Sequence, residues 1–357
     1  MLVVSALLIL TCSVLVPSAD AAADQTYRGQ LDDNAAGLFD ELSATFGSAE
    51  PAETLEIKYV FKDPVLFGED DVDGAKAYIL AEVQAALAAY YLTDPSPIWL
   101  WGLPASPVDK EDVKSSVVSV TVSHSGGITT YQTPNSVTFT LSVPEKYKAD
   151  PAKAVSEVKE KIQTFEGTVR EKVTRINDIL RNVKSVTDKD GEVGNIHDAL
   201  VSGSSSSAGV AAAFTVLAKA SGLEAFTVVG QVMTGDGSAT EAGYWNVVKD
   251  EDGWYAVDST MNGSSWRNCL LAGVTTQIDL AGQQERFGAT LRQGQVFLAE
   301  ALDKLEARLN APQISSSGYD WPDDRSLLDK YGTYVFGAVI AVIIVATLLH
   351  AVRRGDI

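Results

Sequence analysis

A long run without charge near the C-terminus is the feature that most constrains this chain. Residues 331–352 contain no Asp, Glu, Lys or Arg over 22 positions. As a helix rising about 1.5 Å per residue, the run would extend about 33 Å, which suffices for a hydrocarbon core of about 30 Å. Arg353 and Arg354 follow at once, and positive charge stays cytoplasmic. We therefore expect a transmembrane helix at 331–352, a cytoplasmic tail at 353–357 and the large N-terminal part outside the cell; a buried helix of a soluble domain is the less favoured alternative.

A second apolar run, Leu2–Val16, opens the sequence. Small residues follow Pro17, in a pattern typical of a signal peptidase site near Ala21–Ala23. No Lys or Arg precedes Arg28, so the basic segment that usually begins a signal peptide is missing. We still predict a signal peptide at 1–23, because it gives the same orientation as the C-terminal arginines.

Composition and charge narrow the class of protein. With 357 residues, of which 46% are hydrophobic, the chain can bury a sizeable core. Its net charge of −19 argues against nucleic acid and anionic lipid as partners, since both attract basic surfaces. Cys12 lies in the leading apolar run, which leaves Cys269 without an intrachain disulfide partner in a processed chain. The sequence has no CxxC pair and no histidine cluster, so we expect no metal and no cofactor.

The first half of the sequence predicts a small α/β domain at 24–150. Apolar residues recur at helical spacing in two stretches, and β-branched residues gather in three others between Gly, Pro and Asn turn residues. The expected elements are helices at 32–46 and 73–92, a strand at 54–61, and a hairpin of strands at 115–124 and 136–143.

The second half predicts further helices and a hairpin, followed by a polar spacer. A serine run directly before an Ala-rich stretch is expected to lead into a helix and cap it. The expected elements are a long helical stretch at 151–186 with a break near Gly167, a helix beginning after 202–207, a hairpin turn at 249–253, a leucine-faced helix at 298–309 and a spacer at 311–330.

Three segments between Asn195 and Asn262 carry the most specific pattern. Residues 199–214 read ALVSGSSSSAGVAAAF, residues 243–246 read GYWN, and residues 254–260 read WYAVDST. In order and spacing they resemble the core of a transglutaminase-like (papain-like) domain. In that family a helix begins at a cysteine, and the strands that follow carry His-Ala-Trp-Asn and Trp-Tyr-x-Val-Asp-Pro-Thr. The resemblance implies an α+β fold with a papain-like transglutaminase core at 151–310. The unit before it resembles, more distantly, the portion that precedes such cores in prokaryotic surface proteins.

The same resemblance implies that two residues needed for the reaction are replaced. Ser207 stands at the cysteine position and Gly243 at the histidine position, while Asp258 is kept. A serine hydroxyl is far less acidic than a thiol and needs a general base within hydrogen-bond reach. In a serine protease, loss of the nucleophile or the histidine alone costs roughly 10⁶-fold in rate. We therefore expect no catalytic residues, and we treat Ser207, Gly243 and Asp258 as vestigial positions.

The rest of the pattern receives structural or binding interpretations. Asp258 is expected to cap a turn or accept backbone hydrogen bonds, and the aromatic residues are expected first of all to pack in the core. Asn262 begins the glycosylation sequon Asn262-Gly263-Ser264. The candidates for lining the former substrate cleft are Tyr244, Trp245, Asn246 and Trp254.

Three functions fit these observations. The favoured one is a membrane-anchored, cell-surface pseudoenzyme that binds an extracellular protein, peptide or polysaccharide of the cell wall in or near the vestigial cleft. A second is a purely structural spacer or adhesion component. The third is an active acyl hydrolase or protease that uses Ser207 with Asp258, or else Cys269. His197 would be the histidine nearest in sequence to Ser207.

Overall fold

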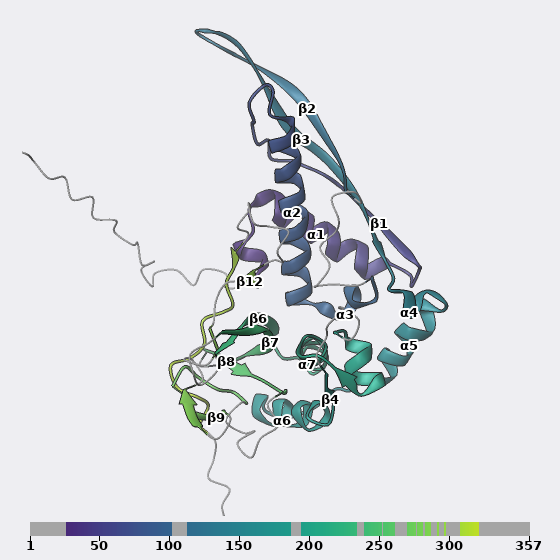
Figure 1. Cartoon of the computed structure of the whole chain (residues 1–357), viewed down its shortest axis with the longest axis vertical. Helices are drawn as coiled ribbons and strands as arrows, with labels where there is room; N and C mark the ends of the chain where they lie inside the picture. The colour runs from purple at the N-terminus through teal and green to yellow at the C-terminus, as the bar shows by residue number, and fades with distance from the viewer. Residues whose placement is uncertain are drawn as a thin grey trace, which may run out of the picture. The chain divides into compact units, whose positions relative to one another are not determined.

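A computed structural model gives the architecture of the chain (Figure 1). The chain divides into two compact units, Met1–Gly318 and Tyr319–Ile357, and every element below belongs to the first. The described residues are mixed α/β. They comprise 26–101, 113–186, 194–233, 239–251, 253–260, 270–275, 277–280, 283–286, 291–292, 296–297 and 308–320.

Two helices of the first half begin where aspartates cap them. Helix α1 (Asp33–Ser48) starts after Asp32, whose carboxylate accepts a hydrogen bond from the backbone N–H of Ala35 at 2.9 Å. Helix α2 (Val72–Thr93) starts after Asp71 in the same way. A helix that is apolar on all sides must be buried on all sides, and α2 accordingly contacts α1, two strands of the first sheet and a strand of the second. Both helices confirm the expected ranges 32–46 and 73–92.

The first sheet has three antiparallel strands in the order β1-β3-β2: β1 (Thr54–Val60), β3 (Gly127–Ser142) and β2 (Val113–His124). The predicted strand at 54–61 and the predicted hairpin are confirmed, but the second strand of the hairpin begins at Gly127 and not at 136. The prediction that Pro134 lies among the turn residues between the two strands is therefore wrong. Proline is tolerated there because the pairing register shifts between Ser116 and Val117, opposite Pro134, as at a β-bulge.

The second half builds helices against a four-stranded antiparallel sheet of order β11-β6-β7-β8. Helix α7 (Ser207–Ala220) packs on β6 (Ala225–Met233) and β7 (Ala239–Asp250), and α6 (Val169–Leu180) packs on α7. The predicted stretch 151–186 is two helices, α5 (Pro151–Lys161) and α6, separated near Gly167 as expected. The turn expected at 249–253 joins β7 to β8 (Gly253–Val257).

Short elements complete the first unit. They are η1 (Arg28–Gln30), α3 (Pro95–Ile98), η2 (Trp99–Trp101), α4 (Glu145–Lys148), β4 (Lys184–Ser185), the π-helical turn η3 (Asp198–Ser202), β5 (Ser204–Ser205), β9 (Gln277–Leu280), β10 (Gln283–Arg286), β11 (Leu291–Arg292), β12 (Val296–Phe297) and β13 (Arg308–Leu309).

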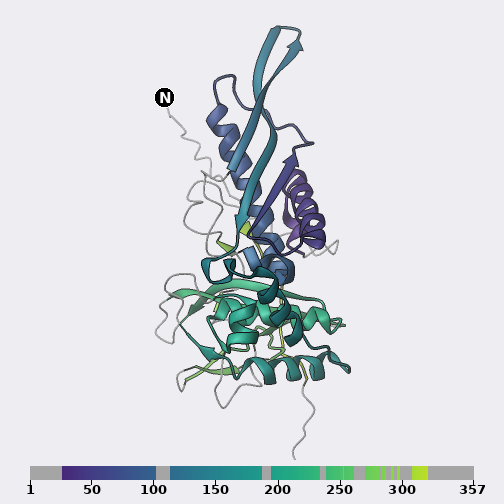
Figure 2. The same cartoon turned by 90° about the vertical axis from the view of Figure 1, so that its right-hand side faces the viewer.

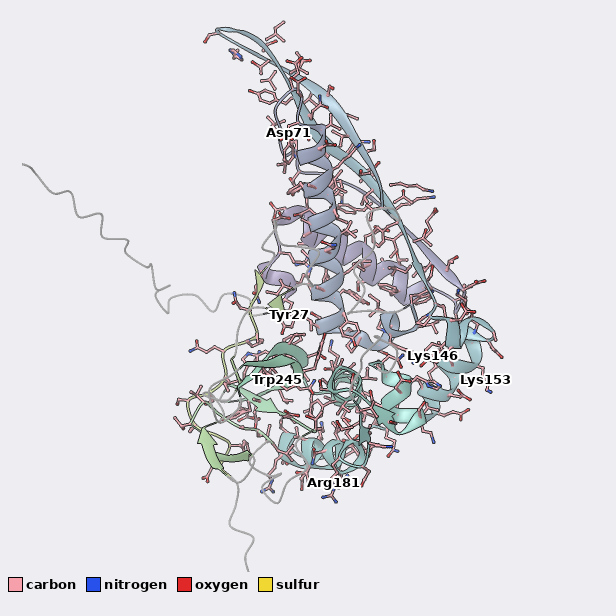
Figure 3. The ribbon with its side chains drawn as sticks, viewed as in Figure 1. Tyr27, Asp71, Lys146, Lys153, Arg181 and Trp245 are labelled. Atoms are coloured by element: carbon pink, nitrogen blue, oxygen red, sulfur yellow. The ribbon has the colours of Figure 1, made fainter. Side chains whose placement is uncertain are left out.

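The two halves of this unit are tied together by buried contacts. Tyr27 is fully buried, and its hydroxyl donates to the carbonyl of Thr227 on β6 at 2.9 Å. Burial raises the pKa of this hydroxyl, so it stays protonated and acts as a donor. Figure 3 labels Tyr27 and also Trp245, which lies on strand β7 of this sheet. The boundary predicted near residue 150 therefore falls inside one unit.

The stretch after Leu309 corrects two expectations. Of the leucine-faced helix expected at 298–309, residues 298–307 lie outside the described residues, and Leu309 lies in the strand β13. Ile314 is buried and bridges Trp254 of β8, and the N–H of Ser315 donates to the Trp254 carbonyl at 2.8 Å. Residues 311–318 thus belong to the folded unit, where a spacer was predicted. Backbone hydrogen bonds hold this segment in place, and its polar side chains do not indicate such pairing.

Several predicted segments lie outside the described residues: the signal peptide, the transmembrane helix, the cytoplasmic tail, Cys12, Cys269 and the sequon residue Asn262. Within the described part of the chain, no helix combines the length and the apolar character that crossing a membrane requires.

Candidate functional site

The candidate site is the start of helix α7. Gly203 takes a left-handed conformation (φ 68°) and turns the chain out of η3. Ser206 is the N-cap in extended conformation but makes no side-chain capping bond, and Ser207 is the first helical residue. The half-buried hydroxyl of Ser207 makes no hydrogen bond to any residue that the structure describes. The predicted position of the helix start is confirmed, whereas the expected capping by the serine run is not seen at this N-cap.

Gly209, in the first turn of α7, sets the position of this helix end. A Cβ atom there would lie 2.5 Å from the carbonyl oxygen and 2.9 Å from the nitrogen of Asn195, and would also collide with the hydroxyl of Ser205. The close neighbour of the glycine is thus the backbone that precedes η3.

A buried polar cluster fixes α7 to the sheet. The amide of Asn246 donates to the carbonyl of Ala211 at 2.8 Å and to the hydroxyl of Thr215 at 2.9 Å. Thr215 in turn shares a 2.8 Å hydrogen bond with Thr227 of β6. All three polar side chains are almost completely buried, so their bonds are shielded from water and rigidify the contact between helix and sheet.

The position where the resemblance implies a histidine is Gly243 of β7, which pairs with Gly230 of β6. Trp245 is 1% exposed and Asn246 is 1% exposed, so neither side chain reaches solvent. Both side chains belong to the core, which was the first expectation for Trp245. Tyr244 is half-buried and is the residue of this segment with the most exposed aromatic side chain.

Trp254 and Asp258 follow on and after β8. Trp254 is 7% exposed and stacks on Phe226 with ring centroids 5.1 Å apart, so it too packs in the core. The Asp258 carboxylate accepts hydrogen bonds from the N–H of Thr260 at 2.9 Å and from its hydroxyl at 2.5 Å. These are the local turn contacts that the sequence analysis expected of Asp258.

Two of the three histidines fall in the described residues, and both are engaged elsewhere. His124 lies at the tip of the β2–β3 hairpin, where its Nε2 contacts the Thr129 hydroxyl at 2.8 Å and its Nδ1 accepts from the N–H of Gly126. His197 precedes η3, and its Nε2 lies 3.0 Å from the carboxylate of Glu157 on α5. A carboxylate can only accept, so Nε2 carries the proton.

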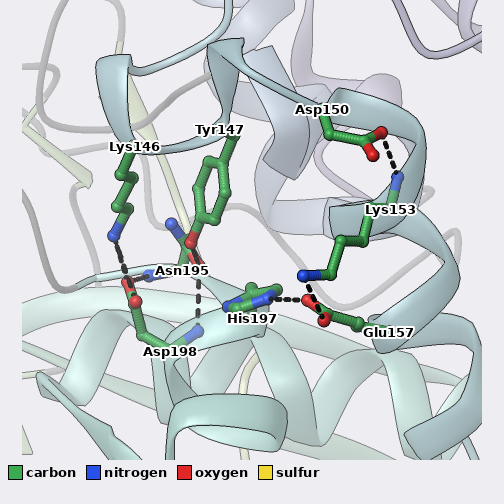
Figure 4. A network of polar contacts seen from close by, with 8 residues as sticks. All are labelled: Lys146, Tyr147, Asp150, Lys153, Glu157, Asn195, His197 and Asp198. Atoms are coloured by element: carbon green, nitrogen blue, oxygen red, sulfur yellow. Dashed lines mark hydrogen bonds and ion pairs between the residues drawn. The ribbon is translucent and has the colours of Figure 1, made fainter.

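Figure 4 shows the network that holds His197. Its ring stacks on Trp99, with centroids 6.1 Å apart, and meets Tyr147 edge to face at 5.1 Å. Its hydrogen bond lowers the pKa of the Glu157 carboxyl. Nδ1 is buried and has no hydrogen-bond partner in the described structure. Neither ring nitrogen forms a hydrogen bond with Ser207.

A second arm of the same network fixes the backbone next to Gly209. Lys146 of α4 donates to both carboxylate oxygens of Asp198, at 3.0 and 2.9 Å. The hydroxyl of Tyr147 donates to the side-chain oxygen of Asn195 at 3.2 Å. No sequence pattern predicted these partners. Helix α4 and η3 are separated by about fifty positions, and Lys146 and Asp198 meet only in the folded chain.

The sequence of the chain matches a known protein family over the segment that forms this site. A sequence model of the transglutaminase-like superfamily matches residues 156–259, which include α7, β7, β8 and Asp258. The chain contains a transglutaminase-like domain. One solved structure, described as the crystal structure of a TGase, is 13% identical in sequence and aligns over 58% of this chain with a TM-score of 0.23. The chain spans about half of that structure's length, 51%. Curated proteins gave no match.

In chemical terms, the transglutaminase-like domain retains the helix N-terminus and the aspartate of such a site. In place of a thiol it offers the Ser207 hydroxyl, and in place of the imidazole a glycine. Among the described residues, no group of three or more His, Cys, Asp or Glu side chains is arranged to hold a metal ion.

Proposed function

We propose that this protein is a cell-surface pseudoenzyme: a transglutaminase-like domain that has kept its fold without the reaction and serves as a binding module. Its ligand would be an extracellular protein, a peptide or a polysaccharide of the cell wall. The observation that carries the proposal is that, among the described residues, no base is hydrogen-bonded to Ser207: His197 is bonded to Glu157, and the strand position where the resemblance implies a histidine is Gly243.

The chemistry follows from this arrangement. Attack on an amide by Ser207 requires removal of its proton by a group within hydrogen-bond reach. The hydroxyl has no such contact in the described structure, and Asp258 is occupied by Thr260. The positive end of the α7 dipole remains at Ser207 and can favour an acidic or carbonyl group, which suits binding and does not by itself supply a nucleophile.

The membrane part of the proposal rests on the sequence. The uncharged run at 331–352, the arginines at 353–354 and the predicted signal peptide at 1–23 agree on a single-pass protein with its large N-terminal part outside. Protease added to intact cells should digest the outer part and leave only a short fragment that carries the C-terminal segment. Full protection of the chain would refute the topology.

Enzyme assays test the pseudoenzyme proposal. The purified full-length chain should show no transglutaminase or peptidase turnover above background. Ser207→Cys combined with Gly243→His should give weak activity at best, because the side chains that would support the new pair are not arranged for it. Turnover by the unmodified chain that is lost in Ser207→Ala, and kept in the matched control Ser206→Ala, would overturn the proposal.

Binding measurements address the module itself. Tyr244 adjoins the former histidine position and is half-buried, so we expect it to contribute to ligand contact. Biolayer interferometry of the full chain against a glutamine-containing peptide and against a cell-wall polysaccharide fraction should show binding that Tyr244→Ala weakens and Ile128→Ala, at the distant hairpin tip, leaves unchanged. Binding that is insensitive to Tyr244 would place the ligand elsewhere, and no binding to either probe would favour the structural-spacer alternative.

A further inference from the structure

The β2–β3 hairpin extends past the rest of its sheet. Strand β1 ends where Val60 pairs with Ser136, and beyond that point β2 and β3 continue as a two-stranded ribbon to the turn at residues 125–126. We call residues 118–133 the hairpin arm. Its tip projects beyond the N-terminal end of α2 in both Figure 1 and Figure 2. The arm therefore presents backbone away from the core.

The arm carries no charge on a strongly acidic chain. Charged residues make up 21% of the sequence, yet residues 115–144 include no Asp, Glu, Lys or Arg. Natural sheets protect exposed edges with lysine, proline or bulges. The arm has none of these beyond the register shift at Ser116/Val117. A net charge of −19 makes two copies repel each other, and the neutral arm is where they can approach without that repulsion.

The two edges of the arm differ. The β3 edge is partly covered, because Phe67 exchanges backbone hydrogen bonds with Gln132 at 2.8 and 3.0 Å, and the Gln132 amide donates to the Glu69 carbonyl at 2.7 Å. Of the described residues, only those of β3 pair with β2. The outer edge of β2 is thus open to a further strand.

One face of β2 is a valine stripe. Val118, Val120 and Val122 alternate with Ser119 and Thr121, so the three valines share a face. Val118 is 39% and Val122 is 42% exposed, which places them among the few large hydrophobic side chains exposed in the described structure. A strand added at this edge would cover the stripe if its own apolar residues came to lie opposite.

We propose that two copies of this chain pair through the outer edges of β2, antiparallel, about a two-fold axis at Val120. In this register Val120 lies opposite Val120 of the second copy, and Val118 lies opposite Val122. In the same register Ser119 lies opposite Thr121 of the second copy, so the polar residues share the other face of the sheet. A shift by one position would set valines against Ser and Thr, because directly opposed residues point to the same side of a sheet. The result is a continuous sheet across two copies.

Cysteine crosslinking tests the register on the full-length chain in a mild detergent, with Cys12 and Cys269 changed to serine. Residues that face themselves across the axis have Cα atoms about 4.5–5.5 Å apart, within the range of a disulfide. Val120→Cys should therefore form a disulfide-linked dimer on oxidation. The matched control Val122→Cys, on the same face, would stand roughly 14 Å from its counterpart, four residues at about 3.4 Å each, and should give about tenfold less dimer.

Sedimentation velocity over a concentration series tests the association itself. Val120→Lys places two ammonium groups opposite each other and should weaken the dimer about tenfold or more, whereas Ile128→Lys at the tip should not. Thermal melts establish that each variant is folded, and the cysteine result stands without the lysine variants. A chain that is monomeric at every concentration, or equal crosslinking at both cysteines, would overturn the proposal and leave the edge to a strand of another protein.

Discussion

Replacing Gly209 with alanine should destabilise the protein, although the same change usually stabilises a helix. Alanine is favoured over glycine in a helix interior by about 1 kcal/mol. At Gly209 the added methyl group would lie 2.5 Å from the carbonyl oxygen of Asn195, where 3.4 Å or more is ordinary contact. The new methyl group and the Asn195 carbonyl oxygen must therefore move apart by about 0.9 Å. The oxygen belongs to the backbone, which cannot rotate away as a side chain can.

The size of the effect follows from these two opposed terms. Overpacking by one methylene-sized group costs about 1–3 kcal/mol, and a shift of nearly 1 Å against backbone belongs at the upper end of that range. After subtraction of the helix preference, we expect a loss of about 1–2 kcal/mol. For a domain of this size that corresponds to a drop in melting temperature of about 2–8 °C.

Differential scanning calorimetry measures this directly, and Gly47→Ala is the matched control. Gly47 lies in the last turn of α1, and a methyl group added there would meet no neighbouring side chain or distant backbone within 4 Å. The same substitution should therefore leave stability unchanged or raise it by about 0.5 kcal/mol. The reasoning fails if Gly209→Ala melts at or above the wild-type temperature, because α7 would then not be seated on the Asn195 backbone.

Three other substitutions probe buried polar groups. Burial of Glu82, together with the neighbouring Asp32, raises the pKa of its carboxyl to about 9. The fold therefore favours the protonated carboxyl, and the stabilisation that this carboxyl contributes is full below about pH 4.3 and is lost as the pH rises toward 9. Glu82→Gln should therefore melt increasingly above wild type between pH 5 and pH 8, and melting curves that stay parallel would contradict this. Asn246→Ala removes a buried donor and should cost about 2–3 kcal/mol in chemical unfolding; a loss below 1 kcal/mol would mean that the cluster does not fix α7. Lys146→Met leaves the buried carboxylate of Asp198 unpaired and should cost about 1–3 kcal/mol, most of which a second change, Asp198→Asn, should restore.

The sequence predicted those elements whose signals are local. Apolar spacing and alanine content located α1 and α2 to within one or two residues. The motif spacing placed the start of α7 at Ser207, and the polar residues at 249–253 placed the turn between β7 and β8. In each case the information lies in neighbouring residues, so the prediction needed no knowledge of distant contacts.

Features that depend on distant pairing were predicted wrongly or not at all. Pro134 read as a break because proline lacks a donor, yet a register shift opposite to it lets β3 continue. Ile314 and Ser315 looked like part of a polar spacer, but their backbone pairs with β8. Backbone pairing leaves little trace in side-chain composition, so neither outcome could be derived from local spacing.

His197 illustrates the same limit at the candidate site. Its place ten positions before Ser207 made it the natural candidate for a base, and the chain does bring it near the start of η3. What decides its role are Glu157 and Trp99, which come from elements far away in the sequence. The availability of a histidine is thus a property of the tertiary structure, even where its distance along the chain is short.

The motif residues divide according to what they bond. Asn246 and Asp258, which match the family pattern, each make hydrogen bonds that hold α7 or a turn in place. The hydroxyl of Ser207, which departs from the pattern, makes no hydrogen bond with described residues, and Gly243 has no side chain to make one. The retained residues are those that the packing of helix on sheet requires, since loss of a buried hydrogen bond costs stability whether or not a reaction takes place. A match to such a motif therefore indicates the fold. The chemistry has to be argued from Ser207 and Gly243, whose side chains do not take part in this packing.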